Sequence, residues 1–100
     1  MKVDITDHAI DRYRERIEPG LSYEEARERI AEGMERAIRL REKTYAGSDM
    51  WHLAGDAGGA AACVFVVERC RHVHKLHPVK TVLTEAEVFG KREDHETELS

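Results

Sequence analysis

The run Cys63-Val64-Phe65-Val66-Val67 decides how this chain folds. It is short, rich in β-branched side chains and free of charge, and turn-forming residues lie on either side of it. A run of this kind is typical of a buried strand. We therefore expect the central strand of a sheet within residues 61–69.

Two neighbouring segments are also expected to be strands. Residues 50–54 precede a glycine-rich stretch, residues 55–59, which is typical of a hairpin loop. Residues 79–84 are rich in valine and threonine and form the last expected strand. Short connections between consecutive strands favour antiparallel pairing. Residues 2–5 alternate polar with apolar side chains, which indicates either a short strand or an extended lead-in.

The residues before these strands indicate a first helix over residues 7–17. Thr6 can cap its first turn through the side-chain hydroxyl. A Pro-Gly pair at residues 19–20 ends it. Its apolar stripe consists of Ile10, Tyr13 and Ile17.

A second helix is expected over residues 22–43, because Ser22 and Glu25 have the spacing of a capping box. Gly33 lies in its middle, where glycine costs about 1 kcal/mol relative to alanine. We therefore expect this glycine to permit close packing on the sheet. The apolar stripe of the helix consists of Ala26, Ile30, Met34, Ala37 and Ile38.

These elements predict an α+β fold, in which two N-terminal helices pack on a small antiparallel β-sheet of three to four strands. Thr84 and Glu87 repeat the capping-box spacing and predict one short helical turn after the last strand. Residues 1–90 are expected to form a single domain. Residues 91–100 are charged and nearly free of apolar side chains, so we expect a disordered tail there.

The charge balance restricts the partners. The chain of 100 residues has a net charge of −4, whereas nucleic-acid-binding proteins usually show a basic balance or a basic stripe. Contact with nucleic acid must therefore rest on local clusters of basic residues, which occur within residues 12–16 and 69–80. The chain has neither a membrane-spanning run nor a signal-peptide core, so we expect a cytoplasmic protein without membrane contact.

Cysteines and histidines gather near the end of the expected central strand. Cys63 and Cys70 are expected to be reduced thiols, because one extended strand would hold them too far apart for a bridge. His72 and His74 share a strand face with Cys70 and could begin a metal site. Basic residues flank this run and no carboxylate lies within it. We therefore expect no metal and no cofactor, and we interpret residues 72–77 as a polar edge or connecting loop.

One group of polar residues suits chemistry on a phosphate. His8, Arg12 and Arg16 line up on the first helix beside its apolar stripe. Such charges are usual on a solvated helix face. They also suit a metal-independent ribonuclease, which needs a proton acceptor, a proton donor and cations or hydroxyls around the phosphate. Trp51 beside His52 is either a stacking platform for a base or a core residue.

Residues 5–16 resemble the opening of small RelE-like proteins, whose first helix begins with a His-Ala pair and continues with spaced arginines. The strands expected over residues 63–67 and 80–84 are similar to the closing strands of that group. These proteins belong to the barnase, EndoU, colicin and RelE type of fold, and many are RNA-cleaving toxins of bacteria or their phages. The resemblance covers roughly residues 3–84.

The resemblance implies catalytic roles for three residues: His8 as acid/base, Arg12 as a phosphate ligand and Thr81 as a hydroxyl that bonds the phosphate. Strand alternation, however, groups Thr81 with Val79 and Leu83 on the apolar face. Lys80 and Thr84 share the other face, so either of them is an alternative site residue. The expected substrate-binding residues are Arg16, Lys80 and Thr84.

Three functions from different classes therefore remain open. The first is a metal-independent RNA endonuclease of the bacterial or phage toxin type, with RNA as substrate and an antitoxin as a protein partner. The second is a non-catalytic binding or inhibitor protein on the same fold, whose acidic surface engages a basic, nucleic-acid-handling protein. A small metal-binding regulator that uses residues 72–77 is the third reading. The sequence leaves the oligomeric state open.

Overall fold

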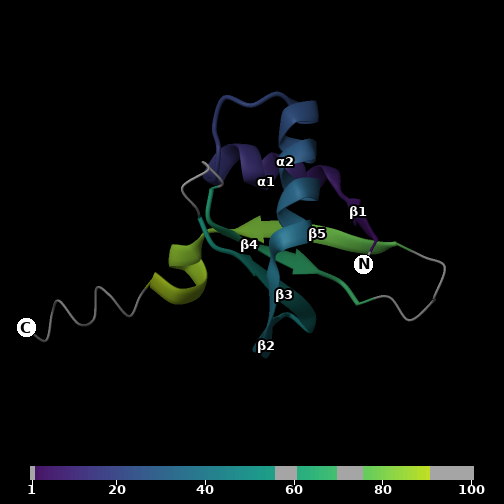
Figure 1. Cartoon of the computed structure of the whole chain (residues 1–100), viewed down its shortest axis with the longest axis vertical. Coiled ribbons are helices and arrows are strands. Elements are labelled where there is room, and N and C mark those ends of the chain that lie inside the picture. Colours follow the sequence, from purple (N-terminus) through teal and green to yellow (C-terminus); the bar gives the residue numbers. More distant parts are fainter. Residues whose placement is uncertain (1, 56–60, 70–75, 91–100) are drawn as a thin grey trace, which may run out of the picture.

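The computed structural model describes residues 2–55, 61–69 and 76–90, and it shows an α+β fold with three layers (Figure 1). Two helices cover one face of a five-stranded sheet, and a short helical turn lies against the other face. The elements are β1 (Val3–Ile5), α1 (Asp7–Arg16), α2 (Tyr23–Arg36), β2 (Ile38–Tyr45), β3 (Ser48–Leu53), β4 (Cys63–Val67), β5 (His77–Leu83) and η1 (Ala86–Gly90).

The sheet is mixed rather than purely antiparallel. Its strand order is β1-β5-β4-β3-β2, so the expected central position of β4 is confirmed. β1 pairs with β5 in parallel, with Val3 opposite His77, and the other pairs are antiparallel. The prediction of three to four antiparallel strands was therefore wrong in number and in one direction. β1 has three residues and its partner lies more than seventy positions away, so no local pattern signals this pairing.

The second helix is shorter than expected. α2 ends at Arg36, and Ala37 already has extended backbone angles, with ψ at 149°. Residues 38–45 form β2 instead, so the predicted helix to residue 43 was wrong. This segment contains good helix formers, but pairing with β3 overrides that weak preference. Ile38, expected in the buried stripe, is 72% exposed.

The rest of the α2 stripe is confirmed. Ile30 is fully buried and Met34 is 8% exposed. Gly33 does permit a close approach, since a Cβ there would lie 2.9 Å from both Leu53 Cδ2 and Phe65 Cζ. The expected capping box is also present, with Ser22 at the N-cap and Glu25 three residues later.

Thr6 fixes the start of α1 twice. Its hydroxyl accepts a hydrogen bond from the Ala9 N–H (3.2 Å), which confirms the predicted cap. The same hydroxyl donates to the Val79 carbonyl (2.7 Å), so the first turn of α1 is tied to β5. The inner side of the helix is formed by Ala9, Ile10 and Tyr13, all buried.

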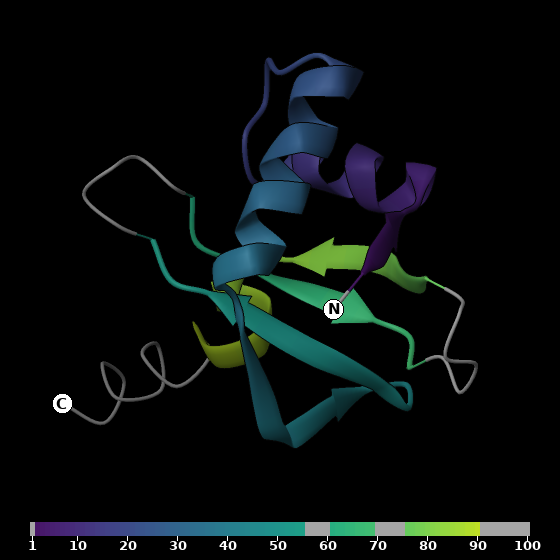
Figure 2. The ribbon, with the colours of Figure 1, turned by 45° about the vertical axis from the view of Figure 1, so that its right-hand side comes forward.

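β2 and β3 form a hairpin whose two-residue turn consists of Ala46 and Gly47, both with positive φ. Positive φ at both central positions is the requirement of the tight hairpin turn. The register of β2 shifts between Leu40 and Thr44. Figure 2 shows the bend that results, which turns the second half of β2 away from the first.

β4 is buried on both faces and divides the core in two. Its odd-numbered residues face the helices, in a cluster with Ile10 and Ile30, and we call this side the helix face. Val64 and Val66 point to the opposite side, the distal face, where Met50 and Leu83 join them. Val88 and Phe89 of η1 cover part of the distal face.

A β-bulge in β5 changes which face of the sheet its side chains point to. Val79 lies opposite Val67, whereas Thr81 lies opposite Val66, with a register shift between the two pairs. Directly paired residues share a face. Thr81 therefore points to the distal face, and Val79 points to the helices. The expectation that Thr81 shares a face with Leu83 is confirmed, but Val79 was wrongly placed on that face, because the bulge adds one residue to the alternation.

Several expectations fall on residues that the structure does not describe. They concern residues 56–59 of the glycine-rich loop, Cys70, His72, His74 and the tail over residues 91–100. In the described part of the chain, no helix has the length and apolarity required to cross a membrane.

Candidate functional site on the distal face

His8 and Arg12 lie on the outer side of α1. Ala9 and Ile10 face the sheet, and His8 is exposed. Residues four apart lie on the same helix face, so Arg12 shares the outer side with His8. The Arg12 guanidinium donates a hydrogen bond to the Glu15 carboxylate at 3.1 Å. The body of α1 thus stands between these two residues and the sheet.

Arg16 and Thr84 hold η1 in place. The Arg16 guanidinium donates to the Glu87 carboxylate at 2.7 Å, which links the end of α1 to η1. Thr84 and Glu87 bond each other's backbone: the Thr84 N–H donates to Glu87 Oε1 at 2.9 Å and the Glu87 N–H donates to Thr84 Oγ1 at 3.1 Å. The predicted capping box at this point is confirmed, and both side chains are engaged within the fold.

Lys80 and Thr81 lie at the bulge of β5. Thr81 points to the distal face, opposite Val66. The Lys80 ammonium lies 3.5 Å from Ser48 Oγ and 3.7 Å from Glu68 Oε1, so it reaches across the end of the sheet. The residues expected to form one site are therefore divided. His8 and Arg12 lie on the outer side of α1, whereas Thr81 lies on the opposite face of the sheet.

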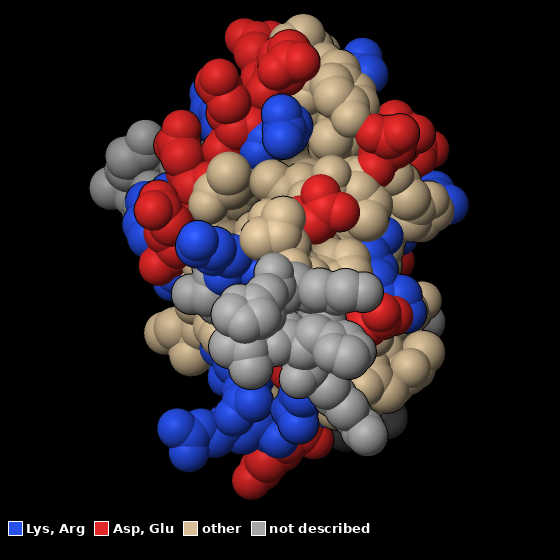
Figure 3. Space-filling model, turned by 90° about the vertical axis from the view of Figure 1, so that its right-hand side faces the viewer, with Lys and Arg blue, Asp and Glu red and all other residues tan. Residues whose placement is uncertain are grey.

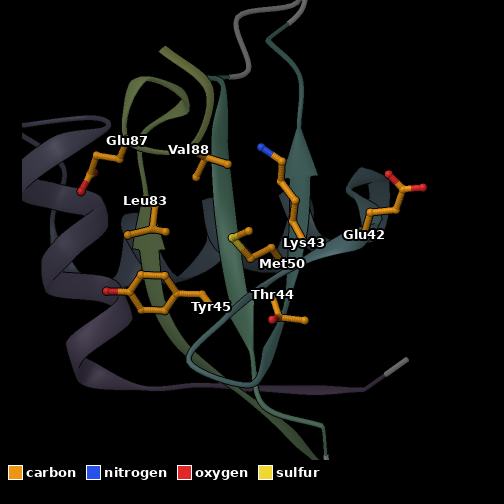
Figure 4. A pocket seen from close by; sticks show the side chains of 8 residues that line it. All are labelled: Glu42, Lys43, Thr44, Tyr45, Met50, Leu83, Glu87 and Val88. Carbon is orange, nitrogen blue, oxygen red and sulfur yellow. The ribbon is translucent and has the colours of Figure 1, made fainter. Parts of the chain in front are cut away.

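A pocket of about 530 Å³ opens on the distal face, between η1 and the second half of β2 (Figure 4). Met50 and Leu83 form its apolar floor, together with Val88 from η1. Such a volume suits a small organic group. The polar side chains that line it are Glu42, Lys43, Thr44, Tyr45 and Glu87.

The ring of Phe89 joins this pocket to a histidine. The Lys43 ammonium lies over the Phe89 ring, 5.0 Å from its centroid, which is a cation–π contact. The His52 ring meets Phe89 edge-on, with centroids 5.1 Å apart and planes at 65°. His52 and the pocket therefore belong to one continuous surface.

His52 is paired with a carboxylate. Its Nε2 lies 2.6 Å from Oε2 of Glu85, a residue between β5 and η1. The side chains are 27% and 43% exposed, so both are accessible to a ligand. A carboxylate that accepts the Nε2–H leaves Nδ1 as a proton acceptor. The pair can thus act as an oriented general base.

The basic edge strand borders this surface. All residues of β2 except Leu40 are exposed, and Arg39, Arg41 and Lys43 recur along it. Asp49 partly neutralises two of the nearby arginines, since its carboxylate lies 2.9 Å from the Arg69 guanidinium and 4.0 Å from that of Arg39. Within the described residues, Arg41 and Lys43 form no salt bridge.

The end of the molecule opposite the helices carries a group of basic side chains. Figure 3 shows acidic and basic side chains interspersed at the helical end, and a group of basic ones at the opposite end, where β2 lies. The net charge of −4 therefore conceals a local basic region. Such a region can attract a polyanion even when the whole chain is acidic.

The titratable groups also differ between the two faces. Hydrogen bonding from the Thr84 backbone, with Arg16 nearby, holds the pKa of Glu87 below its usual value and keeps this carboxylate charged. On the helix face, burial raises the pKa of the Cys63 thiol to about 12. A buried neutral thiol is chemically inert. Of these two groups, only the charged Glu87 carboxylate on the distal face is available for chemistry.

Sequence reasoning missed Lys43, Tyr45 and Glu85 as site residues. Lys43 was assigned to the end of the second helix, Tyr45 was not singled out, and Glu85 lies inside a correctly predicted turn. His52 was singled out only as the neighbour of Trp51. In the strand these two point to opposite faces, and Trp51 packs partly buried against the helix-face core. The signal that could have found the site is the alternation of Met50 and His52, which puts both on one face.

Comparison of the chain with protein-family models, with curated proteins and with solved structures finds no match. The site therefore has to be interpreted from its own geometry. Among the described residues, no cluster of three or more His, Cys, Asp or Glu side chains could hold a metal ion.

Proposed function

We propose that the protein is a metal-independent RNA endonuclease of the bacterial or phage toxin type, acting in the cytoplasm. The observation that carries the proposal is the His52–Glu85 pair at 2.6 Å beside a pocket lined by Lys43 and Tyr45. The resemblance of residues 5–16 and of two strands to RelE-like proteins supports it. We assign the chemistry to the distal face, because His8 and Arg12 lie on the outer side of α1.

The reaction needs only groups that this face and the solvent supply. His52 Nδ1 takes the proton of a ribose 2′-hydroxyl, and the 2′-oxygen attacks the adjacent phosphorus. The bond from phosphorus to the 5′-oxygen breaks, and that oxygen takes a proton from solvent water. The products are a 2′,3′-cyclic phosphate and a 5′-hydroxyl end. Glu85 orients the imidazole and stabilises its cation, as carboxylates do in other histidine dyads.

Binding rests on the strand next to the pocket. Arg41 and Lys43 on exposed β2 can neutralise phosphates along a single strand of RNA. Tyr45, 48% exposed, offers a ring on which a base can stack. Thr81 points to this face and Lys80 lies at the bulge beside it, so both can contact a further phosphate.

The test is incubation of the purified protein with a mixed-sequence RNA in EDTA, with product ends identified by mass spectrometry. We expect cleavage without added metal, and an RNA with 2′-deoxy sugars should stay intact. His52→Ala should reduce the rate by roughly 10²–10⁴-fold, the usual weight of one acid/base group. His8→Ala is the matched comparison, because it removes the exposed histidine of α1 to which the sequence resemblance assigns the acid/base role.

The outcomes separate the assignments. No cleavage between about pH 5 and 9 would contradict the enzyme proposal, because this range spans the protonation change of an ordinary histidine. Loss of activity in His8→Ala with a retained rate in His52→Ala would keep the reaction and move its centre to α1.

A second candidate is a non-catalytic binding or inhibitor protein. The observation that favours it is the acidic outer side of α2, where Glu24, Glu28, Glu32 and Glu35 are exposed (Figure 3). This side could engage a basic, nucleic-acid-handling protein by charge complementarity. Neutralising these glutamates should then abolish capture of such a protein, whereas His52→Ala should not affect it.

A further inference from the structure

The outer edge of β2 offers unpaired backbone groups. β2 ends the sheet, and no other described strand pairs with its outer side. All of its eight residues but Leu40 are exposed, and Ile38 reaches 72%. An open edge of this length is a template for another extended segment. The question is which segment fits it.

Charge disfavours a second copy of the same strand in the register that puts Arg41 opposite its own copy. Arg39, Arg41 and Lys43 would then face basic residues of the partner, and Glu42 is the single acidic residue of β2. Like charges opposite one another destabilise strand pairing. The edge instead favours an acidic segment.

The pocket adds an apolar requirement beside this edge. Its floor of Met50, Leu83 and Val88 is apolar, whereas Lys43 lies at its rim. A complementary segment would therefore carry an apolar side chain near its acidic ones.

The chain itself contains such a segment. Residues 91–100 include Glu93, Asp94, Glu96 and Glu98, and Leu99 is their single large apolar residue. This segment follows directly on η1, whose Val88 lines the pocket. Ten residues can span up to about 33–36 Å when extended, which exceeds the length of an eight-residue strand such as β2.

We propose that residues 91–100 bind the outer edge of β2 and the adjoining pocket, with the acidic side chains against Arg41 and Lys43 and Leu99 against the apolar floor. A tethered segment needs little intrinsic affinity, because a short linker gives an effective concentration in the millimolar range. The bound segment occupies the surface that RNA would use. This docking stands without the proposed function, and only its effect on RNA binding rests on it.

The test of docking uses the full chain and needs no RNA. In the tail variant, Glu93→Gln, Asp94→Asn, Glu96→Gln and Glu98→Gln remove four charges at constant length. We expect the backbone amide resonances of residues 38–45 to shift in this variant, and to shift in the same direction when salt is added to the wild type. Leu99→Ala should shift the methyl resonances of Met50 and Leu83.

The matched control removes the same number of charges elsewhere. Glu24→Gln, Glu28→Gln, Glu32→Gln and Glu35→Gln neutralise the outer side of α2, and residues 38–45 should keep their resonances. Unchanged β2 amides in the tail variant would overturn the docking. Equal shifts in both variants would also overturn it, because they would report a general field and not a contact.

RNA binding then tests the consequence separately. If the tail occupies the edge about nine-tenths of the time, the tail variant should bind a single-stranded oligonucleotide about tenfold more tightly than the wild type. Shifted β2 amides with unchanged affinity would leave the docking in place and overturn its role in RNA access. Absence of RNA binding in both proteins would instead count against the proposed function.

Discussion

The two faces of the sheet are built differently although they share the same central strand. The helix face is closed by α1 and α2, and its contact is so tight that Gly33 has no room for a Cβ. The distal face has four buried residues, partial cover from η1 and a pocket with charged walls. A closed core excludes water and chemistry alike, whereas the half-covered face leaves His52, Lys43 and Tyr45 accessible. The closed side of β4 thus contributes most to stability, and the half-covered side is where we propose the function.

The sharpest test of this difference uses two isoleucines. Ile30 is fully buried on the helix face and Ile38 is 72% exposed on the distal side. Ile30→Ala should cost about 2–5 kcal/mol of unfolding free energy, through lost burial and the remaining cavity. Ile38→Ala should stay within about 0.5 kcal/mol, as exposed substitutions do. Urea melts of both variants measure the values, and equal losses would mean that the faces are equally closed.

Gly33 tests the closeness of the helix contact. Alanine would ordinarily stabilise a helix interior by about 1 kcal/mol relative to glycine. Here its Cβ would lie 2.9 Å from Leu53 and Phe65, so we expect Gly33→Ala to destabilise by about 1–3 kcal/mol through overpacking. The same melts measure it. Ala31→Gly, at an exposed position of α2, is the control for helix preference alone, and a stabilised Gly33→Ala would show that α2 packs more loosely.

The cover of the distal face depends on one small capping box. Thr84→Ala removes the acceptor of the Glu87 N–H and should cost about 1 kcal/mol. Amide hydrogen exchange should speed up at residues 86–89 and stay unchanged in α2, because η1 opens locally. Thr44→Ala, an exposed threonine of β2, serves as the control. Unchanged exchange in η1 would mean that Val88 and Phe89 hold it without the cap.

The faces should also differ in their response to pH. On the helix face, burial raises the pKa of Cys63 from 9.0 to about 12. The neutral thiol therefore contributes fully to the free energy of unfolding below pH 9.0, and this contribution is lost as the pH rises toward 12. Burial also raises the pKa of Tyr13, which adds to the alkaline loss. On the distal face, the pKa of Glu87 is lowered from 4.5. The charged carboxylate therefore contributes to the free energy of unfolding above pH 4.5, and this contribution is lost as the pH falls further.

Urea melts across pH measure these slopes. Cys63→Ala should flatten the alkaline slope and leave the acid slope unchanged, and Glu87→Gln should do the reverse. Identical slopes in all three proteins would show that neither group contributes.

The sequence by itself determined the local features. The apolar run of β4, the caps at Thr6, Ser22 and Thr84, and the stripe of Ile30 and Met34 were all predictable, because each depends on neighbours within a few residues. The α+β class followed from their order. The acidic outer side of α2 could likewise be recognised from the sequence alone.

Only the tertiary structure decided which residues meet. Residues 38–43 have helical preferences of a few tenths of a kcal/mol each, and pairing with β3 outweighs them. The parallel pair of β1 with β5 joins segments too far apart for any local signal. The bulge at Lys80 adds one residue to β5 and moves Thr81 to the distal face.

The candidate site depends on the same long-range contacts. His52 meets Glu85 across thirty-three positions, and His8 lies on the outer side of α1 because Ala9 and Ile10 are buried. A sequence specifies the type of each side chain and its local periodicity. The placement of His52 beside Glu85, and of His8 away from the sheet, depends on how the strands pair and on which face the helices cover. These contacts are set by the free energy of the whole packed chain.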